Sequence, residues 1–178
     1  MAVEALLALA LAHGFTQAKS LAPQTLRLRP EVRAMCRENA CGQYGRRWSC
    51  PPGCGTLEEC RTRIAGYRCG MLVQTTGPVE DSFDIEAMQA LEQRHKRQFL
   101  SLYEALRAKY PRLLALGAGC CTRCAQCTFP DAPCRFPASM LSSMEAYGIL
   151  VTEVCRENGL AYYYGQNTMT YTGCFLLA

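Results

Sequence analysis

The chain has 178 residues, of which 49% are hydrophobic and 19% charged, and its formal net charge is +4. This composition excludes a disordered chain, and no apolar run reaches the roughly 18 residues that a membrane-spanning helix needs. The length predicts one domain, residues 1–178. The basic balance does not indicate nucleic-acid binding, because no run of Lys and Arg interleaved with aromatic residues appears.

The N-terminal segment is dense in apolar residues from 2 to 12, which predicts a helix that ends at Gly14. A signal peptide would begin with basic residues, whereas this segment carries Glu4. We therefore expect a helix over about 1–14 that packs on the domain, and a cytoplasmic protein.

Helical and strand-like patterns alternate along the rest of the chain. Thr56, followed by Glu59, forms a capping box that marks a helix start, and 165–167 is a turn that would join the last two strands as a hairpin. The order predicts an α+β fold, with α/β as the alternative: a mixed sheet flanked by helices, with cysteine-rich loops at 36–60 and 117–137. The predicted elements are a strand over 25–29, a helical turn over 31–35, a helix over 57–65, a strand over 69–74, helices over 85–110 and 139–158, and strands over 160–164 and 171–177.

The thirteen cysteines are the outstanding feature of the chain. A small secreted protein with this many cysteines would be held by disulfides. Here the count is odd, no export signal is apparent, and the chain is long enough to bury its own core. These observations favour metal binding. Cysteine ligands bind as thiolates, and two four-thiolate sites of charge about −2 each would bring the loaded protein near neutrality.

The strongest motif is CxxCxxC at Cys121, Cys124 and Cys127, followed by Cys134 in CRFP. Three cysteines at this spacing wrap one tight loop around a cubic cluster and reach three irons, and a fourth cysteine binds the last iron. Bacterial ferredoxins use CxxCxxCxxxCP. The longer gap before Cys134 leaves open which cluster it serves. We predict a four-iron four-sulfur cluster here, with zinc as the alternative, although structural zinc sites usually pair two separate CxxC knuckles.

The first cysteine region offers a less regular ligand set: Cys36, Cys41, Cys50 and Cys54, with Cys60 as an alternative fourth ligand. Nearby glycines bring backbone N–H groups close to sulfur, which tunes a cluster's potential. A cluster is favoured over zinc and over a loop that binds nothing. The number of clusters, one or two, stays open.

The remaining cysteines are predicted not to be ligands. Cys120 is adjacent to Cys121 and is expected to point away. Both histidines are isolated in sequence, so His13 and His95 are expected to be surface or capping residues. Three cysteines in apolar patterns are expected to pack in the core as small hydrophobes: Cys69, Cys155 and Cys174.

Catalytic machinery is not indicated by any familiar pattern, and whether the protein is an enzyme stays open. The CxxxCxxC spacing of radical enzymes is present at Cys120, Cys124 and Cys127, but it overlaps the stronger motif and the chain is short for the required barrel. Tyr44 and Trp48 either shield a metal or simply pack. Four arginines flank the cysteines, where they either offset cluster charge or attract an anionic partner: Arg46, Arg47, Arg123 and Arg135.

Several motifs together resemble an uncharacterised bacterial and archaeal family of predicted metal-binding proteins, classed as a domain of unknown function. They are C-x4-C-x2-Y at 36–44, WSCPP at 48–52, EEC at 58–60, GAGCCTRCAQC leading to PCRFP, SMEAYGILV at 143–151 and the final strand at 170–177. The resemblance spans about 25–178. It implies metal binding and no reaction. Carried over residue by residue, it implies the ligands Cys36, Cys41, Cys50, Cys121, Cys124, Cys127 and Cys134, and a variable position at Cys120.

The sequence therefore predicts an iron–sulfur protein that transfers electrons to or from a protein partner. Neither nucleic acid nor a membrane is expected as a partner, and the oligomeric state is open. The alternatives are a zinc-stabilised binding module, and a metallo-enzyme or metal-delivery factor whose cluster has an open site.

Overall fold

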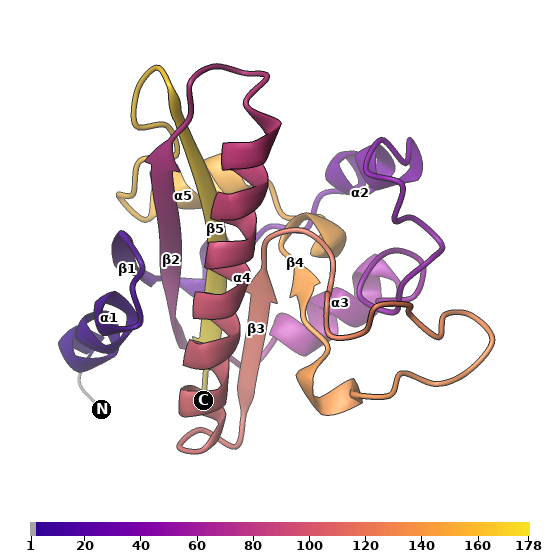
Figure 1. Ribbon diagram of the computed structural model, residues 1–178. Coiled ribbons are helices and arrows are strands. Elements are labelled where there is room, and N and C mark those ends of the chain that lie inside the picture. Colours follow the sequence, from indigo (N-terminus) through magenta and orange to yellow (C-terminus); the bar gives the residue numbers. More distant parts are fainter. Residues whose placement is uncertain (1–2) are drawn as a thin grey trace.

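The computed structural model describes residues 3–178 (Figure 1). Within that range helices and strands alternate along the chain, as the sequence patterns predict. The elements are α1 (Val3–Ala12), β1 (Gln17–Leu21), η1 (Pro23–Thr25), α2 (Pro30–Arg37), α3 (Leu57–Ile64), β2 (Cys69–Pro78), α4 (Ile85–Arg107), β3 (Leu113–Gly117), η2 (Pro137–Ser139), β4 (Ser142–Ser143), η3 (Glu145–Tyr147), α5 (Val151–Glu157) and β5 (Thr168–Leu177). No helix in residues 3–178 has the length and apolar character needed to span a bilayer.

The five strands form one sheet in the order β1-β2-β5-β3-β4. The central strand β5 pairs antiparallel with β2 along its whole length and with β3 on its other side. The short strand β4 pairs parallel with β3, which makes the sheet mixed. The predicted α+β fold, a mixed sheet flanked by helices, is confirmed.

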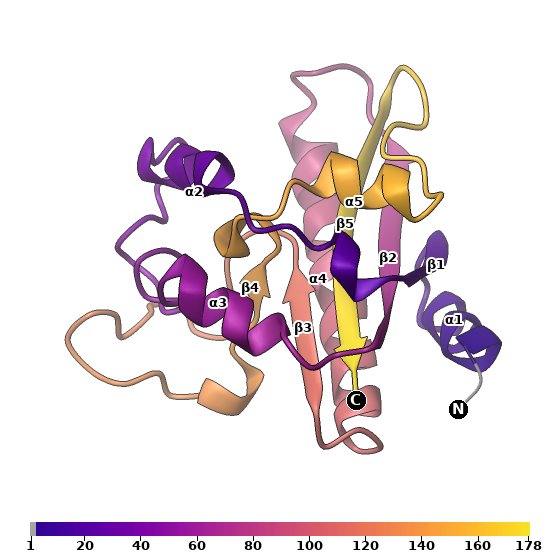
Figure 2. The same cartoon turned by 180° about the vertical axis from the view of Figure 1, so that it is seen from behind.

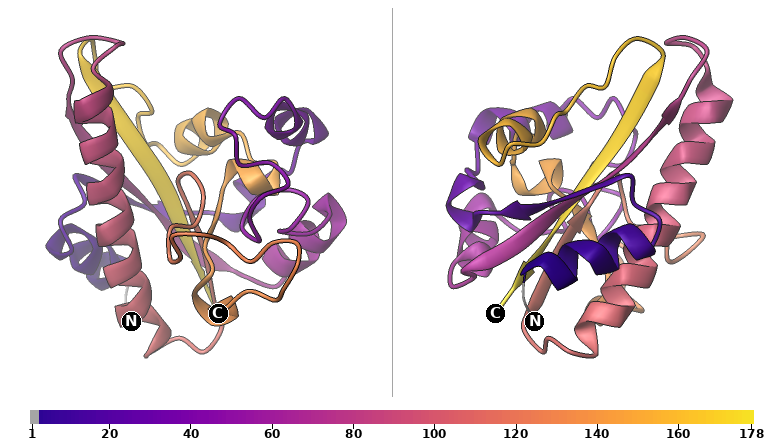
Figure 3. Two further views of the ribbon diagram at one scale, coloured as in Figure 1. Left: turned by 45° about the vertical axis from the view of Figure 1, so that its right-hand side comes forward. Right: turned by 90° about the vertical axis from the view of Figure 1, so that its left-hand side faces the viewer.

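Helices cover both faces of the sheet, with α1 and α4 on one face and α3 and α5 on the other (Figures 2 and 3). Side chains alternate between the faces along each central strand. Met71 and Phe175 lie in the core on the α1 and α4 side, and Leu72 and Cys174 lie in the core on the α3 and α5 side. The cysteine-rich loops lie beyond the β3–β4 edge (Figure 1), and the second loop also reaches α4, where Arg123 lies 3.6 Å from Glu104.

Two helix starts follow the sequence signals. Thr56 and Glu59 form the predicted capping box at α3, with each side chain accepting a hydrogen bond from the other residue's backbone N–H. Asp84 caps α4 by accepting a hydrogen bond from the N–H of Ala87. The turn expected over 31–35 is longer than predicted, because Pro30 begins α2 and Cys36 lies inside it.

The helix predicted over 139–158 is mostly wrong. Only Val151–Glu157 is α-helical, and two 3-10 turns and the short strand β4 precede it. Gly148 adopts a left-handed conformation with φ of 78°, and Ser143 Oγ accepts a hydrogen bond from the N–H of Ala146. These local features interrupt the helical periodicity.

Two predicted strands are also wrong. In 25–29 the chain forms a 3-10 turn ending at Thr25 and then one isolated bridge at Leu28. Residues 160–164 form no strand. Their polar groups bond instead to the buried side chain of Gln74, which donates to the carbonyl of Ala161 and accepts from the Tyr164 hydroxyl. The final strand therefore pairs with β2 and β3 and not in a hairpin.

The close packing of β5 against α4 yields a stability prediction. A Cβ at Gly173 would lie 2.5 Å from Phe99 Cε2 and 3.0 Å from the carbonyl oxygen of Leu116. We expect Gly173→Ala to lower the free energy of unfolding by about 1–3 kcal/mol, the usual cost of overpacking. Gly117→Ala is the matched control, since its Cβ would meet Phe99 at 3.5 Å, an ordinary contact. Denaturant unfolding of both variants tests this, and equal stabilities would contradict it.

Candidate metal centres

The two cysteine-rich loops pack against each other. The Arg47 guanidinium donates to the carbonyl of Cys121 at 3.0 Å, and Ser49 Oγ accepts from the N–H of Cys121 at 3.0 Å. Trp48 continues the contact, because its indole N–H donates to the carbonyl of Ala132 at 3.0 Å and its ring meets Phe129 edge-to-face at 4.9 Å. The two predicted metal-binding regions thus form one surface.

Four of the five cysteines of the second region line one narrow cavity, which we call the triplet cavity: Cys121, Cys124, Cys127 and Cys134. Arg47, Trp48 and Arg123 complete its walls. Its volume is about 20 Å³, and the four cysteines are half-buried. The loop from 118 to 136 contains no helix or strand, so the backbone has no hydrogen-bond ladder that resists opening around a larger group.

Backbone N–H groups and a nearby arginine surround the thiol of Cys127 in this cavity. Its Sγ accepts a hydrogen bond from the N–H of Trp48 at 3.5 Å. Desolvation acts to raise its pKa, but backbone N–H groups of Phe129, Trp48 and Thr128 and the charge of Arg47 together lower the pKa below its usual value. These groups favour the deprotonated form that binds metal.

A second set of four cysteines lines a wider cavity of about 660 Å³, which we call the open cavity: Cys36, Cys41, Cys50 and Cys120. Tyr44 and Glu145 also line it. The thiols are close enough for their charges to interact. The pKa of Cys50 is raised to about 11, mainly by desolvation and to a smaller extent by the charges of Cys120, Cys41 and Cys36. Without a bound cation, burial disfavours the thiolate forms of Cys50 and Cys36.

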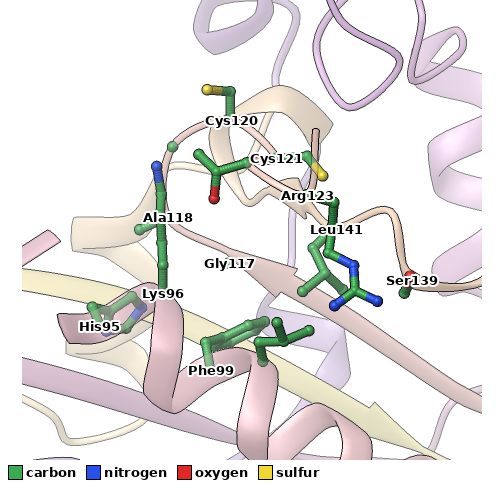
Figure 4. Close-up of a pocket in the computed structure, with 13 residues that line it drawn as sticks. His95, Lys96, Phe99, Gly117, Ala118, Cys120, Cys121, Arg123, Ser139 and Leu141 are labelled. Atoms are coloured by element: carbon green, nitrogen blue, oxygen red, sulfur yellow. The ribbon is translucent and has the colours of Figure 1, made fainter. Parts of the chain in front are cut away.

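The membership of the open cavity differs from the sequence prediction at one position. Cys120, set aside as a non-ligand, lines the open cavity, whereas Cys54 lies elsewhere. Figure 4 shows the Sγ atoms of Cys120 and Cys121 directed away from each other. The sequence signal for this was the Cys-Cys pair itself, because consecutive side chains diverge and can serve two sites. The radical-enzyme spacing is not supported, since Cys120 lies in a different cavity from Cys124 and Cys127.

Cys54 and Cys60 form a buried thiol pair beneath the loops. Cys54 Sγ donates to the carbonyl of Ala146 at 3.5 Å, and the Arg33 guanidinium lies 3.9 Å from Cys60 Sγ. Hydrogen bonding between the two thiols is the main cause that lowers the pKa of Cys60 and raises that of Cys54, and the charge of Arg33 lowers the pKa of Cys60 further. Both residues are almost inaccessible to solvent. This burial holds α3 to the loop that precedes it.

Of the three cysteines that the sequence assigned to the core, two are buried and one is exposed. Cys155 and Cys174 are fully buried, and desolvation raises their pKa values to about 11 and about 12, so both stay protonated thiols. Cys69 is exposed at the start of β2, so its core assignment is wrong. Cys69 does begin the predicted strand, but the helices that cover the sheet do not extend over this first residue of β2.

The surface assignment of His95 is also wrong. Its imidazole is fully buried on α4, and desolvation is the main cause that lowers its pKa to about 4. The charged residues within 92–97 suggested a solvent-exposed face of the helix, but His95 occupies an inward-facing position. His13 is half-buried, with Nδ1 3.1 Å from Ser101 Oγ.

Three of the four arginines that flank the cysteines form polar contacts with other residues of the protein. Arg47 bonds the Cys121 carbonyl, Arg135 donates to the carbonyl of Gln126 at 2.8 Å, and Arg123 lies 3.6 Å from Glu104. Each arginine thereby holds a cationic group beside the cysteines. Among residues 3–178, no three His, Cys, Asp or Glu side chains converge in the arrangement of a mononuclear metal site.

A family model described as predicted metal-binding protein (DUF2284) matches residues 19–177. The chain belongs to this family. The family description states metal binding, which agrees with the two four-cysteine cavities. No curated protein and no solved structure matches the chain.

Proposed function

We propose that this DUF2284 protein binds two iron–sulfur clusters and transfers electrons to or from a protein partner. One cluster would be held in the triplet cavity by Cys121, Cys124, Cys127 and Cys134. The other would be held in the open cavity by Cys36, Cys41, Cys50 and Cys120. When bound, such clusters supply reversible one-electron redox chemistry.

The observation that carries this proposal is the sorting of eight cysteines into two sets of four around two separate cavities. Four thiolates are the complete ligand set of a four-iron four-sulfur cluster. The two sets meet at Cys120 and Cys121, whose Cα atoms are about 3.8 Å apart in any trans peptide. Two centres joined through adjacent ligands are close enough to exchange electrons, as an electron carrier requires.

Surface access and charge fit an electron carrier. The triplet cavity is half-exposed, so a partner can approach one centre closely. Arg46 and Arg135 are exposed, precede and follow the cavity-lining residues Arg47 and Cys134 in the sequence, respectively, and offer positive charge to a docking protein. We infer a redox partner with an acidic docking face, whose association would weaken as salt screens the charges.

Zinc is the second candidate, and the small volume of the triplet cavity favours it there. A volume of about 20 Å³ accommodates a single ion more readily than a four-iron cube. A zinc ion bound by four sulfurs at about 2.3 Å would draw them to about 3.8 Å from one another. The protein would then be a zinc-stabilised binding module with no redox role.

Metal and sulfide analysis of protein purified without oxygen decides between these candidates. We expect about eight irons and about eight acid-labile sulfides per chain, the content of two four-iron clusters. Broad visible absorption should bleach with dithionite, and the reduced protein should show two interacting paramagnets in its electron spin resonance. A colourless protein with about two zinc ions per chain would contradict the proposal and support the zinc module.

A further inference from the structure

A third cavity, of about 100 Å³, lies between α4 and the start of the second cysteine loop (Figure 4). Its walls are mainly apolar, with Phe99, Leu100 and Leu141 facing the backbone of Gly117 and Ala118. Cys120 and Cys121 lie at one end, so the cavity adjoins both four-cysteine sets. Nothing in the proposed electron-carrier function uses this space.

His95 lines the cavity and is fully buried. Within residues 3–178, nothing bonds its Nε2, the one buried side-chain polar atom found without a partner there. A buried polar atom left unpaired costs about 1–3 kcal/mol, so its retention points to a bound group that pairs with it.

A chain of hydrogen bonds fixes the role of that nitrogen. The Gln98 amide N–H donates to the carbonyl of Gly14 at 2.8 Å, so Gln98 Oε1 is the acceptor for the Thr75 hydroxyl, also at 2.8 Å. Because the hydroxyl hydrogen of Thr75 is directed at Gln98, Thr75 Oγ1 is the acceptor in its second hydrogen bond. It accepts from the Nδ1–H of His95 at 2.9 Å. A neutral imidazole protonated at Nδ1 carries a lone pair at Nε2. His95, which lines the cavity, therefore carries an unpaired hydrogen-bond acceptor.

Charges at the rim are already paired. Lys96 Nζ lies 2.5 Å from Glu92 Oε1, and Arg123 lies 3.6 Å from Glu104. The cavity consequently offers no free charge to an ionic ligand. It offers apolar walls and one buried acceptor, which suit an uncharged, largely apolar molecule that carries one O–H donor.

We propose that this cavity binds a small hydroxyl compound about the size of a single aromatic ring, with its O–H donating to His95 Nε2. An apolar cavity of about 150 Å³ holds benzene in another protein, so about 100 Å³ that opens to the surface accommodates a comparable ring. Binding here needs no metal, although it places the ligand beside Cys120 and Cys121.

The test uses phenol as the donor probe and anisole, its O-methyl ether, as the matched probe without a donor. Isothermal calorimetry on the anaerobically purified full chain should show phenol binding at least about tenfold more tightly than anisole, the value of one buried hydrogen bond. In His95→Phe, phenol binding should weaken about tenfold while anisole binding changes little. Equal binding of the two probes, or no phenol binding up to about 10 mM, would overturn the proposal.

Two further measurements keep the test informative if His95→Phe folds poorly. Leu141→Phe should fill the cavity from its half-buried wall and abolish phenol binding while His95 stays in place. Nitrogen NMR of wild-type His95 should show the tautomer protonated at Nδ1, and the opposite tautomer would overturn the assignment. Iron content should be the same in His95→Phe as in wild type; iron loss would make the imidazole a metal ligand instead. A colourless protein that binds phenol refutes only the cluster proposal.

Discussion

Cys120→Ser is expected to lower bound iron from about eight to about four atoms per chain, because one of the two clusters loses a thiolate ligand. Serine keeps the size of the side chain but is a poor ligand for iron, so the change tests ligation with little change in packing. The measurement is iron and sulfide content after anaerobic purification. The cluster held by Cys121 and its loop should persist and give an isolated paramagnet on reduction, without the interaction seen in the wild type.

The matched control is Cys54→Ser, because Cys54 was the fourth ligand that sequence spacing favoured and it now lies outside the open cavity. We expect Cys54→Ser to keep its full iron content. Its cost should appear in stability, since it places a hydroxyl in a buried site where the thiol donates to the Ala146 carbonyl. Full iron in Cys120→Ser together with iron loss in Cys54→Ser would restore the original ligand set and refute the one proposed here.

Acid is expected to destabilise the protein through His95. Burial lowers the pKa of His95 in the folded state from 6.5 to about 4, so the unfolded chain binds more protons in this interval. The stability that His95 contributes by being neutral is complete above pH 6.5. It is lost as the pH falls toward 4, and amounts to about 3 kcal/mol at about 1.4 kcal/mol per pKa unit.

The surroundings of His95 support this direction. Lys96, on the same helix, opposes a second positive charge nearby, and within residues 3–178 no carboxylate offsets protonation of the ring. Thr75 on β2 and Tyr171 on β5, whose ring centroid is 6.1 Å from that of His95, are the polar neighbours from the sheet. Neither carries negative charge at acid pH.

Comparison with His95→Phe separates the stability contributed by neutral His95 from the acid sensitivity of carboxylates. Glu153 and Asp84 have lowered pKa values from their hydrogen bonds to Arg29 and to backbone N–H groups, respectively, and their stabilisation is also lost in acid. Those contributions are common to both proteins. Urea unfolding from pH 7 to pH 4 should give a shallower loss of stability for the variant by about 3 kcal/mol. Parallel curves for the two proteins would show that His95 does not titrate with folding.

Much of the fold was predictable where local signals act alone. The capping box at Thr56, the long helix α4 and the strands β2 and β5 follow from residues near in sequence. The wrong helix over 139–158 failed because Ser143 and Gly148 form local turns whose backbone geometry outweighs the apolar periodicity. The edge strand β1 and the short strands β3 and β4 were missed, since their pairing depends on partners far along the chain.

By itself, the sequence determined that this is a cysteine-rich, metal-binding chain with two cysteine regions, because ligand type and close spacing are local chemistry. Only the tertiary structure decided how the cysteines divide. The contacts of Arg47 and Ser49 with Cys121 join two loops more than 70 residues apart in the chain. Residue spacing cannot encode that contact, which is why Cys120 and the buried acceptor on His95 came to light only in three dimensions.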